Sequence, residues 1–229
     1  MKIAVLGSRM VGRTIASKLH ELGHEVSIGT RNVANTLANE QADNYGNPPF
    51  KVWHADKGEI QLKTFSDAAA EAEVIINCTS GMASLQALEL AGEAHLADKP
   101  LIDIANPLDF SNGMPPSLNP VNTDSLAEQI QAKFPAAKVV KTLNTMNAYV
   151  MVNPSMIQGD HNVFVSGNDA EAKAVTKSIL QSFGWQEHLI LDLGDITTAR
   201  GTEMLLPVWL RLWSALGTAE FNFHIQRKS

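Results

Sequence analysis

The chain has 229 residues and a mass of 24.8 kDa, which predicts one domain or one domain with a short appendage. Hydrophobic residues make up 45% and charged residues 18%, a balance that favours a full core over disorder. A net charge of −6 without a basic tract argues against nucleic acid as the main partner. A single cysteine, Cys78, excludes an internal disulfide framework. No apolar run approaches the roughly 18 residues that span a bilayer. Because Met1 also begins directly in the first predicted strand, we expect a soluble cytoplasmic protein without a signal peptide.

The first thirty-two residues predict a dinucleotide-binding unit. An apolar strand at 2–6 runs into a glycine turn at 7–12, and a helical pattern with Val11, Ile15, Leu19 and Leu22 at three- and four-residue spacing follows. A second apolar strand occupies 25–29. Strand, glycine turn, helix and strand in this order bind a dinucleotide, with its pyrophosphate at the helix N-terminus.

The glycine turn fits this function at two of its three positions. Gly7 lets the chain turn sharply out of the strand, and Gly12 lets the helix pack close to the sheet. Arg9 stands where the G-x-G-x-x-G fingerprint has its middle glycine. Taken alone, such a turn is also compatible with an ordinary strand-to-helix connection. In its context, we expect the free N–H groups of residues 8 to 12 to face a pyrophosphate.

The end of the second strand indicates which dinucleotide binds. NAD-binding proteins usually place an acidic residue there, but none occurs between Val26 and Asn39. Thr30 instead offers a hydroxyl, and Arg31 offers a charged, forked donor suited to phosphate. Asn32 is placed to cap the next helix. The sequence therefore predicts NADP(H) rather than NAD.

The remaining elements predict an α/β fold with a doubly wound, mostly parallel (Rossmann) sheet. Strands alternate with helices along the chain, as in such sheets. In chain order we expect a helix to Asn39, a turn-rich loop at 43–49, a strand at 60–65, a helix capped by Ser66 up to Ala72, a strand at 74–78, a helix at 83–91, a strand at 100–104, a long loop to Asn122, a helix at 125–134 and a strand at 138–143.

Small and polar residues follow three of these strands, at 79–81, 105–107 and 143–147. Carboxyl ends of parallel strands meet at one edge of the sheet and form its ligand site. We therefore expect the ribose and nicotinamide to lie along these three segments.

The last third predicts a small C-terminal α/β lobe. Strands at 162–166 and 188–191 flank a helix at 170–183, and a long apolar helical stretch runs from Thr202 to about Ile225, interrupted only by Pro207 and Gly217. That helix is apolar over too wide an arc for a surface helix, so we expect it to pack on its own core or on a second subunit. We divide the chain into an NADP-binding domain, 1–150, and a lobe, 151–229, with the substrate cleft and a homodimer contact.

Three segments carry a resemblance to a known family. Val5-Leu6-Gly7 with Met10-Val11-Gly12, then 28–32, and finally 139–147 resemble the coenzyme F420-dependent NADP oxidoreductases. The resemblance implies a Rossmann domain, a small C-terminal lobe, a homodimer, and hydride transfer between NADP(H) and a deazaflavin. The family also has relatives that act on flavin.

The resemblance implies roles for individual residues. These are the pyrophosphate loop at Ser8, Arg9, Met10 and Val11 between Gly7 and Gly12, the 2′-phosphate site at Thr30, Arg31 and Asn35, and the nicotinamide side at Thr79, Ser80, Asn106 and Ala148. Asn144, Met146 and Asn147 border the implied acceptor pocket. Asn144 and Asn147 replace a histidine and a proline that are common in the family's deazaflavin enzymes, so the acceptor is left open among F420, a flavin and a quinone-like ring.

Three functions remain open from the sequence. Hydride transfer between two rings needs little acid–base chemistry from the protein, so no catalytic residue and no metal site are predicted. A small carbonyl or imine reductase would need a proton donor, and the candidates are His161, His188, Lys141 and Tyr149. The third alternative is a non-catalytic NADPH-binding redox sensor.

Overall fold

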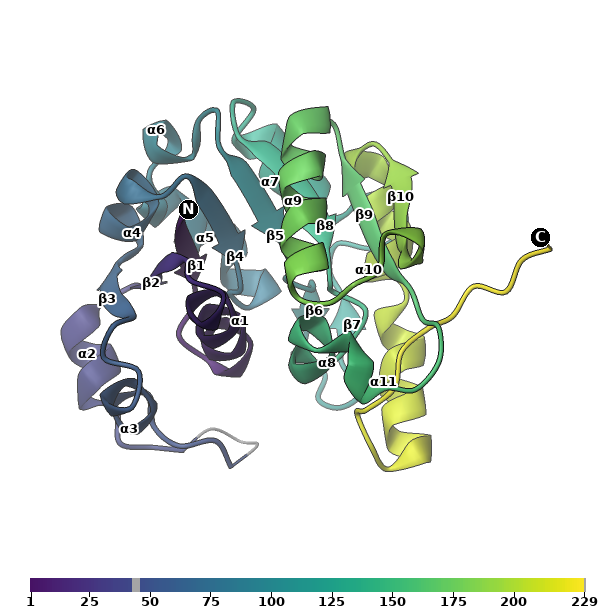
Figure 1. Ribbon diagram of the computed structural model, residues 1–229, viewed down its shortest axis with the longest axis horizontal. Helices are drawn as coiled ribbons and strands as arrows, with labels where there is room; N and C mark the ends of the chain where they lie inside the picture. The colour runs from purple at the N-terminus through teal and green to yellow at the C-terminus, as the bar shows by residue number, and fades with distance from the viewer. Residues whose placement is uncertain (43–45, 229) are drawn as a thin grey trace.

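The computed structural model describes residues 1–42 and 46–228 and contains a central sheet covered by helices on both faces (Figure 1). Among these residues the sheet has eight strands in the order β10-β9-β8-β5-β4-β1-β2-β3. All neighbours are parallel except β8 and β9, which are antiparallel. The predicted doubly wound, mostly parallel sheet is therefore confirmed. Part of the turn-rich stretch predicted at 43–49, residues 43–45, lies outside the described residues.

The strands are β1 Lys2–Leu6, β2 Glu25–Thr30, β3 Gln61–Thr64, β4 Val74–Asn77, β5 Pro100–Asp103, β6 Leu108–Asp109, β7 Ser117–Leu118, β8 Lys138–Thr142, β9 Val163–Gly167 and β10 Ile190–Gly194. The α-helices are α1 Met10–Glu21, α2 Val33–Ala38, α3 Phe50–Ala55, α4 Phe65–Glu71, α5 Gly81–Ala91, α6 Glu93–Leu96, α7 Leu126–Lys133, α8 Ala148–Val152, α9 Ala170–Ser182, α10 Ala199–Glu203 and α11 Leu206–Leu216. Short 3-10 helices span Pro154–Met156, Glu187–Leu189 and Ile196–Thr198.

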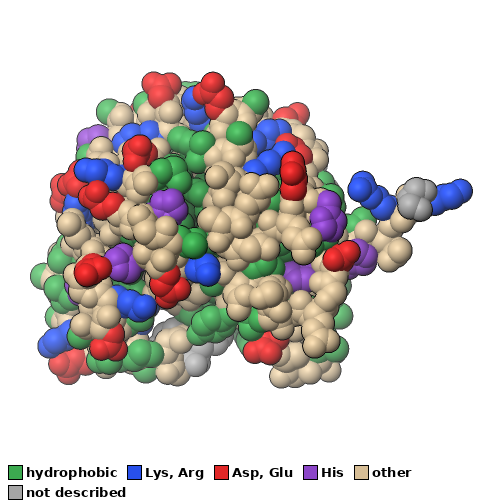
Figure 2. Space-filling model, in the orientation of Figure 1, with side chains coloured by type: hydrophobic (Ala, Val, Ile, Leu, Met, Phe, Trp, Pro, Cys, Tyr) green, Lys and Arg blue, Asp and Glu red, His purple; other side chains and the backbone are tan. Residues whose placement is uncertain are grey.

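Each face of the sheet has its own buried apolar cluster. Ile15 of α1 and Leu180 of α9 belong to one cluster, and Leu88 of α5 and Ile130 of α7 belong to the other. This is the burial that alternating strands and helices predict, because helices must cover both faces of a parallel sheet. On the outer surface, basic and acidic side chains are interspersed on the face shown in Figure 2, without a basic patch.

Several details differ from the sequence prediction in the first half. Thr64 caps α4 in place of Ser66, since the Thr64 hydroxyl accepts a 3.1 Å hydrogen bond from the Asp67 N–H. Helices α3 and α6 were not predicted, because both are short and neither has a long apolar repeat. Within the long loop after β5, β6 and β7 form a two-stranded antiparallel ribbon.

The C-terminal third continues the same sheet. Strand β9 pairs antiparallel with β8, and β10 pairs parallel with β9. The boundary predicted at residue 150 therefore lies between strands β8 and β9, which belong to the same sheet. The division into 1–150 and 151–229 stays a prediction.

The long helix predicted from Thr202 to Ile225 is wrong. Two short helices, α10 and α11, replace it, and Gly217 ends α11 in a left-handed conformation with φ of 67°. The chain then runs extended past the start of β9, where the Asn162 N–H donates to the Phe223 carbonyl at 2.8 Å, and its end reaches away from the body (Figure 1). No helix in the described part of the chain is long and apolar enough to cross a membrane.

Candidate active site

A cavity of about 470 Å³ lies at the carboxyl ends of the central strands, between the sheet and α11. Such a volume is typical of small-molecule and cofactor sites. Nine of the predicted site residues line it: Met10, Val11, Thr79, Ser80, Asn106, Asn144, Met146, Asn147 and Ala148. The other lining residues are Asn47, Cys78, Gly81, Ile104, Ala105, Leu108, Phe110, Tyr149, Met151, Leu206, Trp209, Trp213 and Ala219.

The glycine turn brings the end of β1 into close contact with the end of β4 and with the first turn of α1. Gly7 has φ of 123°, and a Cβ there would lie 2.7 Å from the Cys78 carbonyl oxygen. A Cβ on Gly12 would lie 1.9 Å from the Gly7 carbonyl oxygen. Arg9 is exposed, and no side chain caps α1, so the first N–H groups of this helix remain available to an anion. The turn therefore fits a pyrophosphate even though its middle glycine is replaced.

A further glycine at the site was not singled out from the sequence. Gly81 begins α5, and a Cβ there would lie 2.0 Å from the Asn106 carbonyl oxygen. The loops after β4 and β5 can approach this closely only because position 81 has no side chain. Position 81 directly follows Thr79 and Ser80, and this placement is the sequence signal that could have indicated its role at the site.

The predicted 2′-phosphate residues differ in exposure. The Thr30 side chain is buried, and its hydroxyl lies 2.7 Å from the Thr36 hydroxyl. Arg31 and Asn35 are exposed, and within residues 1–42 and 46–228 the Arg31 guanidinium has no hydrogen bond or ion pair. Asn32 caps α2 as predicted, accepting a 2.9 Å bond from the Asn35 N–H. Arg31 is thus the cation at this strand end that is free to bind a phosphate.

Two asparagines join the ends of β5 and β8. The Asn106 side-chain amide donates to the Asn144 carbonyl at 2.8 Å, and the Asn144 amide donates to Asn106 Oδ1 at 3.0 Å. Leu143 adopts φ of 61°, a conformation that costs a branched residue roughly 1 kcal/mol or more. That turn brings the Asn144 carbonyl back to Asn106. Asn144 therefore shapes the cavity wall in addition to bordering the predicted acceptor pocket.

A buried charge cluster lies beneath the cavity. The Lys141 ammonium is 2.8 Å from carboxylate oxygens of both Asp103 and Glu203, and all three side chains are at most 3% exposed. Burial alone would lower the pKa of Lys141, but the two carboxylates outweigh it and raise the pKa above its ordinary value. Glu203 also accepts hydrogen bonds from the Leu126 and Ala127 N–H groups at the start of α7. Lys141 is therefore a fixed cation that holds strand ends together.

Hydrogen bonds connect this cluster to the cavity wall. Asn77 donates to Asp103 Oδ1 at 2.8 Å and accepts a 2.6 Å bond from the Thr79 hydroxyl, which lines the cavity. Between them, burial and the charge of Asp103 raise the pKa of the Cys78 thiol, so it stays protonated. The position of Thr79 thus depends on buried charges below it.

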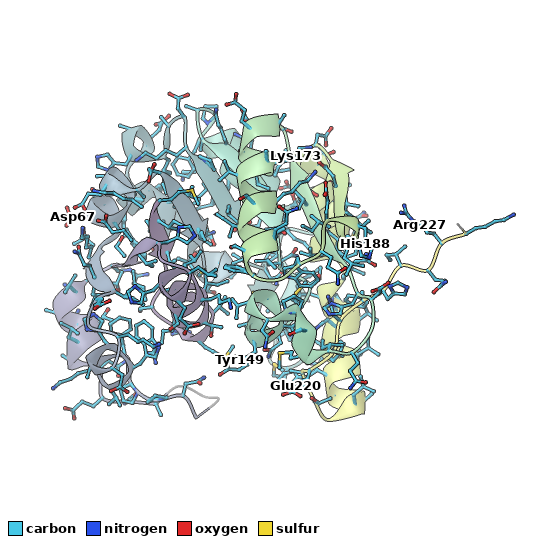
Figure 3. The ribbon with its side chains drawn as sticks, viewed as in Figure 1. Asp67, Tyr149, Lys173, His188, Glu220 and Arg227 are labelled. Carbon is cyan, nitrogen blue, oxygen red and sulfur yellow. The ribbon has the colours of Figure 1, made fainter. Side chains whose placement is uncertain are left out.

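Of the four proton-donor candidates, Tyr149 alone lines the cavity. Lys141 is enclosed in its ion pairs. His161 is buried, with Nε2 3.0 Å from the Pro154 carbonyl and Nδ1 2.9 Å from the Asn222 amide. His188 is exposed on another part of the surface, whereas Tyr149 lies on α8 (Figure 3).

Aromatic residues line the α11 side of the cavity. Trp209 and Trp213 of α11, expected in a core or interface, line the cavity together with Phe110. Phe221 of the extended tail stacks on Trp209, with ring centroids 5.3 Å apart and planes inclined by 24°. This contact depends on how the tail packs against α11, and no local sequence pattern predicts that packing.

The fold and this site define a class, the NADP-dependent oxidoreductases with a Rossmann sheet. The family described as "NADP oxidoreductase coenzyme F420-dependent" has a sequence model that matches residues 2–107. A crystal structure from Arthrobacter sp. FB24, provisionally named an F420-dependent NADP-reductase, is 61% identical over 99% of this chain and 100% of its own, with a TM-score of 0.94. The chain belongs to this family and is an NADP-dependent oxidoreductase. Membership favours catalysis over the alternative of a non-catalytic sensor.

The chain is also similar to parts of longer proteins. The metalloreductase STEAP3 of Rattus norvegicus is 27% identical over 212 residues, which are 91% of this chain, and the chain spans 38% of the length of that relative. An imine reductase from Aspergillus terreus, in complex with NADPH4 and dibenz[c,e]azepine, is 18% identical, with a TM-score of 0.60 over 94% of this chain and 62% of its own. At this identity the likeness concerns the fold alone.

Proposed function

We propose that the protein transfers a hydride between NADPH and a planar ring acceptor, either F420, a flavin or a quinone-like ring. The observation that carries this proposal is that one cavity is lined both by the predicted nicotinamide-side residues at the strand ends and by aromatic side chains of α11. Two rings held face to face with water excluded are what this reaction requires of a protein.

The proposed cofactor site follows the carboxyl edge of the sheet. The N–H groups at Ser8 to Val11, between Gly7 and Gly12, bind the pyrophosphate. Arg31 and Asn35 bind the 2′-phosphate, and the buried Thr30 hydroxyl supports this loop through Thr36. Thr79, Ser80, Asn106 and Ala148 surround the nicotinamide, while Asn144, Met146 and Asn147 border the acceptor.

When bound, NADPH supplies the hydride, and the reduced acceptor takes up one proton. The protein orients the rings and excludes water, because α11 covers the cavity on the side away from the sheet. Tyr149 supports a second candidate function, reduction of a carbonyl or imine, since it lines the cavity and carries a hydroxyl that can donate a proton.

A homodimer through α11 is also proposed. Of the eleven residues of this apolar helix, all within the described chain, Leu206 alone is buried, while Val208 and Leu216 are 44% and 56% exposed. Burial of this face against a second copy would remove apolar surface from water.

The single cysteine and the use of NADPH support a cytoplasmic location.

The test is whether the purified protein oxidises NADPH with F420, FMN, riboflavin or a naphthoquinone. The reaction is monitored by the absorbance of the reduced nicotinamide. We expect turnover with at least one ring acceptor, and faster turnover with NADPH than with NADH. Turnover with a cyclic imine or a ketone, but with none of these ring acceptors, would favour the second candidate function over the first.

A further inference from the structure

Asn144 is a buried amide in the wall of the cavity. Among the described residues, four asparagines line this cavity, and Asn144 is the most buried of them, with 2% of its surface exposed. A buried polar group needs hydrogen-bond partners, which here can come from neighbouring protein groups, from water or from a bound ligand. The partners that the protein supplies therefore indicate what a ligand has to offer.

The neighbouring Asn106 fixes the orientation of the Asn144 amide. A backbone carbonyl can only accept, so the Asn106 side-chain nitrogen, 2.8 Å from the Asn144 carbonyl oxygen, is the donor. Asn106 Oδ1 can then only accept, and it does so from Asn144 Nδ2 at 3.0 Å. An Asn144 amide turned by half a rotation would place two oxygens against each other. Asn144 Oδ1 therefore points away from Asn106.

Two polar groups of the Asn144 amide lack a partner. Within residues 1–42 and 46–228, Oδ1 accepts no hydrogen bond, and Nδ2 uses one of its two N–H groups. The fully enclosed polar atoms without a partner belong to other side chains of this described part, Trp209 and Asn222, so Asn144 Oδ1 is accessible from the cavity that the residue lines. The wall thus presents a fixed acceptor next to a donor, which is complementary to the edge of an amide or imide.

The place of Asn144 along the sheet assigns this amide to the acceptor. The strands lie side by side in the order β2, β1, β4, β5 and β8. The proposed cofactor runs from Arg31 after β2, across the glycine turn after β1, to Thr79 after β4. Asn144 follows β8, one strand beyond Asn106 at the end of β5, and it shares the cavity with the aromatic side chains of α11. Its amide therefore lies on the side of the nicotinamide that faces away from the pyrophosphate.

We propose that the Asn144 amide selects the acceptor by binding a ring N–H that lies next to a ring carbonyl, the edge that the pyrimidinedione of flavins and deazaflavins presents. This inference rests on the proposed hydride transfer and selects one class among its acceptors. Asn144 Oδ1 accepts from the ring N–H, and the Asn144 N–H donates to the adjacent carbonyl. A quinone has carbonyl oxygens but no N–H, so it would leave Oδ1 without a partner.

Riboflavin and N3-methylriboflavin test this selection, because the two rings differ in one N–H that is replaced by N–CH3. Calorimetric titration of the NADP⁺-loaded protein should give about tenfold tighter binding for riboflavin, which corresponds to about 1.4 kcal/mol. Equal affinities, tighter binding of the methylated ring, or no binding of either ring would overturn the proposal.

A variant distinguishes the hydrogen bond from an effect of size. Asn144→Leu keeps a side chain of similar size but removes both polar groups, so riboflavin should lose its tenfold advantage. An advantage that persists would show that the wall excludes the methyl group by its shape, and it would overturn the proposal. If this variant does not fold, the two rings titrated into the unaltered protein still decide.

The matched control is Asn168→Leu at the opposite edge of the sheet, since Asn168 follows the antiparallel strand β9. This change also removes an asparagine oxygen, one that accepts a 3.0 Å hydrogen bond from the Ile196 N–H. The control should keep the tenfold preference for riboflavin. Loss of the preference in both variants would show that it reports general stability, and it would overturn the role of Asn144.

The nicotinamide carboxamide offers the same pair of groups, so a second ligand pair identifies which ligand the amide binds. The 3-acetylpyridine analogue of NADP⁺ carries a methyl group in place of the carboxamide nitrogen. The ratio of its affinity to that of NADP⁺ should be the same in the unaltered protein and in Asn144→Leu. A preference for NADP⁺ that falls in Asn144→Leu would place the nicotinamide on this amide and overturn the assignment to the acceptor.

Binding without turnover separates this inference from the proposed function. If riboflavin binds about tenfold more tightly than its methylated form but no ring acceptor oxidises NADPH, the proposed function fails and the selection by Asn144 stands. Turnover with equal affinities for the two rings would leave the proposed function standing and overturn the selection.

Discussion

Replacing Lys141 by Met removes the one cation of the buried charge cluster while keeping a side chain of similar length. Asp103 and Glu203 would then remain in the interior, each having lost an ammonium at 2.8 Å. Breaking a buried ion pair typically costs 3–5 kcal/mol, because a charge is left without compensation. We expect a loss of about 3 kcal/mol here, at the low end of this range, because Asp103 keeps its hydrogen bond from Asn77 and Glu203 keeps two N–H donors of α7.

The free energy of unfolding, measured by urea denaturation, should fall by about 3 kcal/mol, and Tm by roughly 6–12 °C for a chain of this size. The matched control is the triple variant Lys141→Met, Asp103→Asn and Glu203→Gln, which removes all three charges together. It should recover much of the lost stability. A Lys141→Met protein as stable as the unaltered one would refute the view that this cluster is a coupled ionic unit.

The pH dependence gives the same cluster an independent test. The pKa of Lys141 is raised in the folded state, so folding favours its charged form. Its contribution to stability is fully present below the ordinary lysine value of about 10.4 and is lost as pH rises through the raised folded value. Denaturation midpoints of the unaltered protein should therefore fall more steeply above about pH 10 than those of the triple variant. Parallel curves would contradict the assignment.

Three further predictions concern the cofactor, the strand-end loops and the assembly. Arg31→Ala should lower the preference for NADPH over NADH by about 2 kcal/mol, roughly 30-fold in kcat/KM, while Arg227→Ala on the extended tail leaves it unchanged; an unaltered preference in Arg31→Ala would mean that another group reads the 2′-phosphate. Gly81→Ala should cost roughly 1–3 kcal/mol of stability in thermal unfolding and weaken NADP⁺ binding, because the new Cβ would lie 2.0 Å from the Asn106 carbonyl oxygen, and an unchanged variant would show that the loop moves freely. Light scattering should give twice the chain mass of 24.8 kDa, and Leu216→Glu should shift it to the monomer; a monomeric unaltered protein would remove the proposed α11 interface.

The dinucleotide-binding half could be predicted closely because its signals are local. The apolar run at 2–6, the glycines at 7 and 12 and the helix spacing from Val11 to Leu19 each fix structure within a few residues of themselves. Asn32 as a helix cap is a similar case, since the side chain acts on a backbone group three residues away. The strand-end segments could also be placed together, because parallel topology dictates that their carboxyl ends share an edge.

The α11 side of the cavity could not be predicted in this way, because long-range packing creates it. Apolar spacing continues beyond residue 216, but Gly217 in a left-handed conformation ends α11, and the tail then packs Phe221 on Trp209. The antiparallel pairing of β9 with β8 has no signature in either strand. The role of Lys141 likewise depends on Asp103 and Glu203, 38 and 62 positions away in the chain.

The proposed hydride transfer requires that one cavity hold both the nicotinamide and a ring acceptor. A crystal structure of the protein with NADP⁺ and riboflavin would show whether it does. We expect the nicotinamide beside Thr79, Asn106 and Ala148, with the flavin ring between it and Trp209. A nicotinamide outside this cavity, or a flavin bound elsewhere while the cavity stays empty, would contradict it.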